Sequence, residues 1–415
     1  MHKRIIRILL YIIMTSNKTN SIVIFITITI ILDSAGFGII FPVLPELLEK
    51  VLNADLSTAA KYGGILTLAY AFMQFIFAPI LGILSDYYGR RNVLLLSLLG
   101  FSIDCFIMAV ATEYWVLFIS RLIAGITGAT FAVASAAITD ITTSTNRTKY
   151  FGYLNAAFNI GFIIGPLVGG LLGEYHLTYP FYFAGILGLL NVTYGYFYFP
   201  ETNNLRTKKQ ISFASLSPLQ TLKSIKQFKE LTVLFFVFFL LSTASHSMES
   251  TWSFFTMMQF DWSKQHVGFS LTIIGIIGFV VQAYFLQYLS KKLSDQKLIY
   301  IGLIVSCIGL ILLGFSTSVQ QLWIGITLYL LGSIHQTGFQ SMLSKSLNQQ
   351  YQGELQGVLG SLNGLTTIIG PPIFTYCFYF FTQDNAPLYL PGIAFILSAL
   401  LISTSLYLII QYSRK

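Results

Sequence analysis

Long apolar segments recur along the whole chain and are separated by short polar loops. A helix needs about 20 apolar residues to cross a hydrocarbon core of about 30 Å. Backbone groups in lipid must find their hydrogen-bond partners within the protein, which favours helices. The pattern therefore predicts an all-α integral membrane protein with twelve transmembrane helices. Their predicted ranges are 21–44, 62–83, 92–110, 113–138, 150–173, 178–199, 231–258, 266–289, 298–317, 321–343, 355–381 and 388–411.

The basic residues of the loops predict the orientation of these helices. Of the 24 Lys and Arg, 20 lie in the amino tail, in the loops after even-numbered spans and in the carboxyl tail. Cytoplasmic loops carry an excess of basic residues, so we expect both termini in the cytoplasm and the chain in the inner (cytoplasmic) membrane. The same loops account for the net charge of +8, which is therefore no evidence for nucleic-acid binding.

The composition argues against several other classes of protein. The chain is 55% hydrophobic and 10% charged, with a mean hydropathy of +0.71, whereas soluble domains carry roughly 25% charged residues. Cys105, Cys307 and Cys377 lie in separate spans without metal-ligand spacing, so we expect inert thiols and no metal site. The sequence has no cofactor fingerprint, nucleophile elbow or Walker-type glycine loop. We therefore expect neither an enzyme nor an ATP-driven pump.

The two halves of the chain look like copies of one another. A shift of 205 residues places Gly165 on Gly370 and Pro166 on Pro371. The predicted parts are an amino tail (1–20), an amino-terminal half (21–199), a cytoplasmic linker (200–230), a carboxyl-terminal half (231–411) and a carboxyl tail (412–415). Two interpretations of the first 13 residues stay open: a basic amphipathic stub, or a segment that is not translated because Met14 is the true start.

Charged residues inside the apolar segments are the first candidates for function. Asp33 lies about twelve residues into the first span, where a carboxylate costs roughly 2.5–3.5 kcal/mol unless it faces a wet cavity or the bundle interior. Arg121, in the fourth span, must find an anion, and either Asp33 or Asp104 of the third span can supply it. Such a pair can make proton binding depend on conformation. A fixed structural ion pair would look the same in sequence.

The carboxyl-terminal half offers its own polar residues. His246 and Glu249 are three residues apart in the seventh span and so share a helix face. They can carry a proton or bind a cation, unless the helix ends there and both reach bulk water. Further candidates for lining a cavity are Gln74, His335, Gln336 and Gln340.

The loop between the second and third spans combines glycines with charges. Its two glycines permit a tight turn and a close helix approach. Its charged residues can form a network at the helix ends that breaks and re-forms as the halves move, which would make it a conformational latch. The latch candidates are Gly82, Asp86, Gly89, Arg90, Arg91 and, from the end of the fourth span, Asp140. The loop resembles the signature of the major facilitator superfamily, whose six-plus-six repeat surrounds a central site.

The fifth span is rich in glycine. Glycines on one face let a neighbouring backbone approach, while a proline bends the helix. The spacing resembles the antiporter motif of drug/proton exporters in that superfamily and favours export. The residues are Gly152, Gly161, Gly165, Pro166, Gly169 and Gly170.

Longer stretches narrow the resemblance. Residues 32–45, 70–86, 121–130 and 352–357 look like the tetracycline/proton antiporters, and the resemblance covers residues 21 to 400. That family exports a cationic metal–tetracycline chelate in exchange for a proton. The resemblance implies a small-molecule substrate that arrives as a divalent-metal chelate, a proton gradient in place of a cofactor, and a monomer in the lipid bilayer. The residues that it makes essential are Asp33, Asp104, Asp86 and Arg121.

Two positions depart from that family. Ser306 stands where the family has a ninth-span aspartate that is needed for proton coupling, and Tyr87 follows Asp86 where a basic residue is usual. We hypothesise that Glu249, with His246, replaces the missing carboxylate.

The sequence predicts proton-coupled efflux of a tetracycline-like amphipathic drug by alternating access. One alternative is a proton-coupled exporter or importer of another small metabolite, and the fifth-span glycines argue against import. The other is a membrane sensor that kept the fold and lost transport, against which the costly intramembrane charges argue.

Overall fold

The computed structural model describes residues 18–143, 146–203, 228–347 and 351–414, and most of the predicted tail (1–20) and linker (200–230) lies outside these residues. The described residues form helices joined by short loops. The helices are α2 (Lys18–Leu52), α3 (Leu56–Tyr88), α4 (Arg90–Val110), α5 (Tyr114–Thr127), α6 (Thr130–Ile141), α7 (Arg147–Tyr175), α8 (Tyr179–Tyr198), η3 (Lys229–Leu231), α10 (Thr232–Phe260), α11 (Lys264–Val280), η4 (Val281–Phe285), α12 (Leu286–Ser290), α13 (Asp295–Gly314), α14 (Val319–Gly332), α15 (Ile334–Lys345), α16 (Gln352–Thr382) and α17 (Ile393–Ser413).

The predicted all-α fold with twelve spans is confirmed. Among the described residues, ten helical segments are both long and apolar enough to cross a bilayer. The other two predicted spans are α8, which is rich in tyrosine, and the α14–α15 pair, in which α14 alone has only 14 residues. Both are helical and pack in their own half, with α8 against α4 and α14 against α13.

Two of the spans differ from the prediction because they are broken. The fourth span, predicted as one helix, is interrupted at Gly128, whose N–H bonds to the carbonyl of Gly125 at 3.3 Å rather than to the residue four positions back. The tenth span is interrupted at Ser333, whose N–H bonds to Leu330 at 3.1 Å. The breaks therefore lie in corresponding spans of the two halves.

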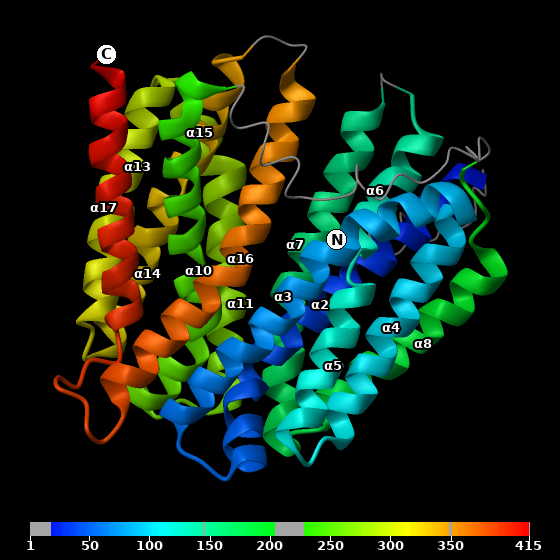
Figure 1. The fold of residues 1–415 in the computed structure, drawn as a ribbon, viewed down its shortest axis with the longest axis horizontal. Helices are drawn as coiled ribbons and strands as arrows, with labels where there is room; N and C mark the ends of the chain where they lie inside the picture. The colour runs from blue at the N-terminus through cyan, green and yellow to red at the C-terminus, as the bar shows by residue number, and fades with distance from the viewer. Residues whose placement is uncertain (1–17, 144–145, 204–227, 348–350, 415) are drawn as a thin grey trace, which may run out of the picture.

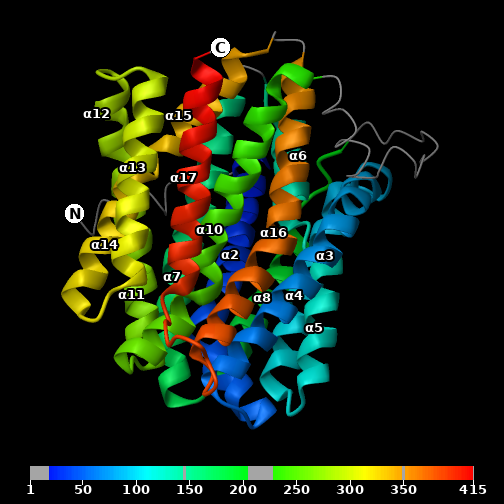
Figure 2. The same ribbon diagram turned by 60° about the vertical axis from the view of Figure 1, so that its left-hand side comes forward.

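The contacts between helices follow the internal repeat. In the first half α7 packs on α2 and also crosses to α11, while in the second half α16 packs on α10 and also crosses to α3. Figure 1 shows the two groups of helices next to each other, and Figure 2 shows α16 and α3 side by side. Two equivalent helix pairs, α7 with α11 and α16 with α3, therefore make the most extensive contacts between the halves.

Glycines of α7 make these contacts close. A Cβ atom added at Gly165 would lie 2.4 Å from the carbonyl oxygen of Ala35, and one at Gly169 would lie 2.4 Å from that of Ile39, both on α2. Gly170 faces the other way, and its added Cβ would lie 3.0 Å from the Cα of Gly268 on α11. Two further motif residues also meet α2: Gly161 faces its backbone, and Pro166 lies against Gly38. The remaining one, Gly152, has open space around it.

The two halves are joined most firmly at the end of the bundle opposite the linker. There Lys264 of α11 forms an ion pair with Glu46 of α2, and the backbone N–H of Gln265 donates to Glu174 of α7 at 3.3 Å. The largest buried apolar cluster also includes residues of both halves at this end, among them Val43 and Phe254. We refer below to this end as the closed end and to the other as the linker end.

The glycine contacts give a matched pair of substitutions. We expect Gly165→Ala to destabilise the protein by about 1–3 kcal/mol, because the added methyl group overlaps the α2 backbone, which cannot move aside cheaply. Gly152→Ala, in the same helix, should keep or raise stability by up to about 1 kcal/mol, because the added methyl group meets open space and alanine favours the helix. Thermal unfolding of the two purified variants in detergent checks this, and equal midpoints would contradict the assigned contact.

Candidate functional site

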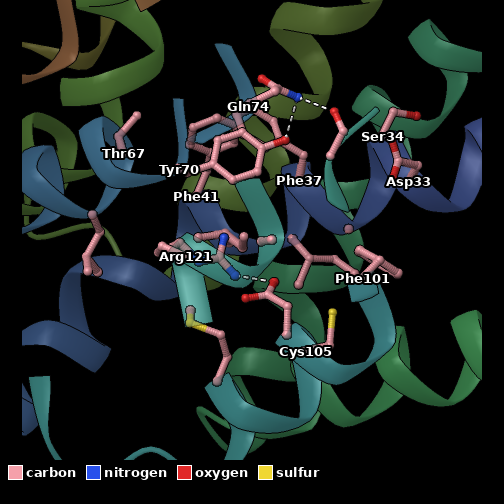
Figure 3. Close-up of a pocket in the computed structure, with 18 of the residues that line it drawn as sticks. Asp33, Ser34, Phe37, Phe41, Thr67, Tyr70, Gln74, Phe101, Cys105 and Arg121 are labelled. Atoms are coloured by element: carbon pink, nitrogen blue, oxygen red, sulfur yellow. Dashed lines mark hydrogen bonds and ion pairs between the residues drawn. The ribbon is translucent and has the colours of Figure 1, made fainter. Parts of the chain in front are cut away.

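A cavity of about 300 Å³ lies between the two halves and holds most of the predicted charged residues. Figure 3 shows Asp33, Tyr70, Gln74 and Arg121 around it. The amino-terminal half supplies Asp33, Asp104 and Arg121, while the carboxyl-terminal half supplies His246 and Glu249. A volume of this size is at the lower end of the range for drug-sized ligands, roughly 300–1,000 Å³.

Arg121 is paired with Asp104 and not with Asp33. One guanidinium nitrogen of Arg121 contacts one oxygen of the Asp104 carboxylate, and the hydroxyl of Ser120 donates to the other oxygen. Both members of the pair are buried. Removing one member would leave an uncompensated buried charge, which typically costs about 3–5 kcal/mol.

Asp33 has a different environment. Its carboxylate accepts a hydrogen bond of 3.1 Å from the hydroxyl of Thr130, the first residue of α6. The break in the fourth span thus places the positive end of the α6 dipole next to this carboxylate. Sequence spacing gave no sign of Thr130, because the two residues are 97 positions apart.

Gln74 supports the break. Its amide nitrogen donates to the carbonyl of Gly128 at 2.7 Å and to the hydroxyl of Tyr70 at 3.0 Å. A carbonyl released by a helix break must be satisfied inside the protein, because lipid offers no partner. The structure places Gln74 in the wall of the central cavity, where it also stabilises the discontinuous helix.

His246 and Glu249 interact with each other in the cavity wall. Nδ1 of His246 lies 3.2 Å from the Glu249 carboxylate, and Nε2 lies 3.4 Å from the hydroxyl of Thr367 on α16. His246 is buried, whereas the Glu249 side chain is 48% exposed. Of the two predicted alternatives, the structure therefore has the pair lining the central cavity and not at a helix end.

Ser306 lies away from this cavity. Its side chain is fully buried, and an added Cβ at Gly332 of α14 would lie 2.3 Å from its hydroxyl oxygen. Its hydroxyl donates only a long bond of 3.5 Å, to Tyr329. The small side chain therefore lets α13 and α14 approach closely.

The three candidate residues of the tenth span lie in two different places. His335 does not line the central cavity, which corrects the prediction, because it points toward α13, where its Nδ1 lies 2.8 Å from the carbonyl of Gly332. An added Cβ at Gly302 of α13 would lie 2.8 Å from the Cβ of His335. Gln336 and Gln340 lie on another face of α15 and line a second cavity of about 180 Å³.

The latch candidates come together at the linker end of the first half. Arg90 forms ion pairs with Asp86 and, at 3.1 Å, with Asp140. Gly89 has a φ of 99°, which favours glycine, and its missing side chain leaves room for Glu201. The Glu201 carboxylate accepts from the N–H of Arg90 at 2.9 Å and so caps α4. Glu201 was not among the predicted latch residues, although it is the first acidic residue after the sixth span.

Two latch predictions need correction. Arg91 takes no part in the ion-pair network of the described residues, because its guanidinium donates to the carbonyl of Tyr196 and lies 5.4 Å from the centre of that ring. Gly82 makes no close helix approach, since nothing lies within 4 Å of an added Cβ. Its carbonyl instead accepts from the hydroxyl of Ser85 at 2.6 Å.

The central cavity carries an excess of negative charge. Arg121 balances Asp104. Among the described residues, Asp33 and Glu249 have no cationic partner other than His246, when that imidazole is protonated. Apolar side chains, including Phe37 and Phe101, form much of the remaining wall. Such a site suits an amphipathic ligand with a positive charge.

Comparison with known proteins places this architecture in a family. The model of the family described as "Major Facilitator Superfamily" matches residues 26–371 and 244–410. The chain belongs to the major facilitator superfamily. It is therefore a multi-pass membrane protein whose relatives are transporters of small molecules.

Within the superfamily the chain is similar to drug-resistance proteins. It is 36% identical over 399 residues to the tetracycline resistance protein, class H, of Pasteurella multocida, covering 95% of this chain and 97% of that protein. It is 38% identical over 361 residues to the class C protein of Escherichia coli, covering 86% and 90%. These relatives confirm the resemblance seen in the sequence.

Solved structures agree on the fold. A bacterial homologue of the human lysosomal transporter Spinster, crystallised in an inward-facing and unoccupied conformation, superposes with a TM-score of 0.77. The sequences are 11% identical, and the match covers 96% of this chain and 98% of that one. The likeness supports the major facilitator fold alone.

The packing of Ser306 predicts what an aspartate would do there. We expect Ser306→Asp to lower stability by about 3 kcal/mol, because the carboxylate would be buried against Gly332 without a partner. Ser306→Ala should be close to neutral. Thermal unfolding and membrane yield of the two variants check this, and a stable aspartate variant with increased transport would show that this position still accepts a carboxylate.

Proposed function

We propose that this protein exports a tetracycline-like amphipathic drug across the inner membrane in exchange for protons. The proposal rests on the central cavity, which is lined by Asp33 from one half and Glu249 from the other. Among the described residues these carboxylates are in excess of the cationic side chains. A positively charged drug or drug–metal chelate and a proton can compete for such carboxylates. The similarity to tetracycline resistance proteins supports this substrate class.

Exchange for protons supplies the energy. A proton that enters down the membrane potential provides about 2.3 kcal/mol per 100 mV, and a pH gradient adds to this. We propose that the protein works as a monomer with both termini in the cytoplasm, without a resident cofactor and without catalysing a reaction. The basic loops support this orientation.

In this orientation the closed end faces the periplasm and the linker end faces the cytoplasm. The contacts of Lys264 with Glu46 and of Gln265 with Glu174 would then seal the periplasmic side, and the cavity would load from the cytoplasm. Transport requires the halves to rock about the cavity, which is the usual mechanism for this fold. The network of Arg90 joins helices of the first half only, so it would hold the linker end of that half together during the motion.

The fifth-span glycines support a role in this motion. Gly165 and Gly169 hold α7 on α2 of its own half, whereas Gly170 meets α11 of the other half. Around Gly170 the two backbones meet without side chains between them, which lets α7 and α11 tilt there at low cost. Farther along the same pair of helices, the hydroxyl of Thr272 donates to the carbonyl of Ile163 at 3.1 Å. We propose that the contact at Gly170 is the pivot of export.

Glu249 is our candidate for the carboxylate that couples protons to transport in the second half. It lies in the cavity next to His246, whereas Ser306 cannot take up a proton and is sealed behind α14. Asp33 and Glu249, one from each half, would then exchange drug for protons, while the Arg121–Asp104 pair holds the first half in shape.

Loss of Asp33 tests the proposed function. We expect a strain without other efflux pumps to become tetracycline-resistant when it expresses the wild-type chain, and to lose this resistance with Asp33→Asn, because the neutral amide cannot exchange a cation for a proton. Everted vesicles should show drug-evoked proton movement for the wild type and not for Asp33→Asn. Glu113→Gln, an exposed carboxylate before α5, is the matched control. A wild type without resistance or drug-evoked proton movement would refute tetracycline export.

Loss of Glu249 tests proton coupling separately. We expect Glu249→Gln to reduce drug-evoked proton movement at least about tenfold, equivalent to about 1.4 kcal/mol, with Glu249→Asp restoring part of it. Asp384→Asn, an exposed carboxylate in the loop after α16, should have no effect. Proton-coupled export that survives in the glutamine variant would assign coupling to other residues.

A further inference from the structure

The second cavity differs in chemistry from the central one. It lies within the carboxyl-terminal half, between α10, α15 and α16, and has a volume of about 180 Å³. Its polar side chains are the carboxamides of Gln336, Gln340 and Asn363 together with two serine hydroxyls, so it carries no charge. Its apolar wall comes from leucine and phenylalanine side chains.

The three carboxamides make no side-chain hydrogen bond with the residues that the structure describes. All three side chains are exposed at the surface of this cavity, in contrast to two more enclosed amides of the spans. Gln74 donates to Gly128, and Asn191 donates to Thr29 at 2.9 Å. An exposed amide keeps its N–H donors and its carbonyl acceptor free for other partners. The three amides of the second cavity are therefore available to water or to a ligand.

The second cavity continues the first along two helices. On α10, Ser242 and Ser245 line the second cavity, and the next turns carry Glu249 in the central one. On α16, Asn363 lines the second cavity, and Thr367, four residues on, lines the central one. At 1.5 Å per residue, Ser242 and Glu249 are about 10 Å apart along the helix axis.

The direction of this path follows from the chain. α10 and α16 both start at the linker end, so the residues with lower numbers lie nearer to that end. The second cavity therefore lies between the linker end and Glu249 on α10, and on the linker side of Thr367 on α16. Its volume is below the range of roughly 300–1,000 Å³ for pockets that enclose a drug-sized ligand. It can hold one edge of such a ligand.

We propose that the second cavity is an entry subsite that binds the uncharged polar edge of the substrate. Carboxamides both donate and accept hydrogen bonds, so Gln336, Gln340 and Asn363 suit a ligand edge with hydroxyl, carbonyl or carboxamide groups. The cationic part of the same molecule is then directed toward Glu249 and Asp33. This inference rests on the proposed export function, to which it adds the recognition of neutral groups.

The double variant Gln336→Met/Gln340→Met tests the subsite. Methionine is close to glutamine in size but cannot make these hydrogen bonds. We expect the KM for tetracycline, supplied with Mg²⁺ to everted vesicles, to rise about tenfold, which is the combined effect of two neutral hydrogen bonds. The maximal rate should stay within about twofold of the wild type, because the carboxylates of the central cavity are intact. Gln287→Met, an exposed amide of α12 outside both cavities, is the matched control.

Several outcomes would overturn the proposal. These are a KM within about twofold of the wild type, or a reduced maximal rate at an unchanged KM, which would assign the amides to packing or turnover. If the double variant folds poorly, Asn363→Leu alone and equilibrium binding of tetracycline–Mg²⁺ to the purified full chain replace it, with weaker binding expected and unchanged binding contradicting the subsite. A wild-type chain that does not export tetracycline would instead refute the proposed function itself.

Discussion

The structure depends on one constraint: inside a bilayer, every charge and every free backbone group must find its partner within the protein. Arg121 meets this constraint through Asp104, and the broken fourth span meets it through Gln74. These partners come from three different spans, α3, α4 and α5. The polar interactions therefore fix how the helices of the first half are arranged, in addition to supplying a site.

Close backbone contact is the second organising feature. Helices in lipid gain little from the hydrophobic effect when they associate, so packing of small residues has a large share in holding them together. In α7 this packing serves two neighbours, because Gly165 faces α2 and Gly170 faces α11. In α16, the repeat of α7, Gly370 lies against His246 of α10. Corresponding glycines of the two halves thus have different neighbours: Gly165 allows close packing on α2, whereas Gly370 contacts His246, which lines the central cavity.

The two halves share a fold but divide the chemistry between them. The first half has a buried ion pair, a carboxylate at the end of a half-helix and an ion-pair network at the linker end. The second half has the His246–Glu249 pair and a group of uncharged amides. Both halves thus supply a carboxylate to the central cavity, and the second half adds a group of uncharged amides.

The sequence by itself determined the twelve spans, the internal repeat and the presence of intramembrane charges, because the length and polarity of each segment follow from its own residues. It also brought Arg90 together with Asp86, since residues four apart share a helix face. Only the tertiary structure decided that Arg121 pairs with Asp104, that Thr130 contacts Asp33 and that Glu201 caps α4. Those choices depend on which helices become neighbours and how they are rotated. Periodicity along one helix fixes the face of a residue but not what that face meets, which is why His335 turned out to face α13 and Ser306 to lie behind α14.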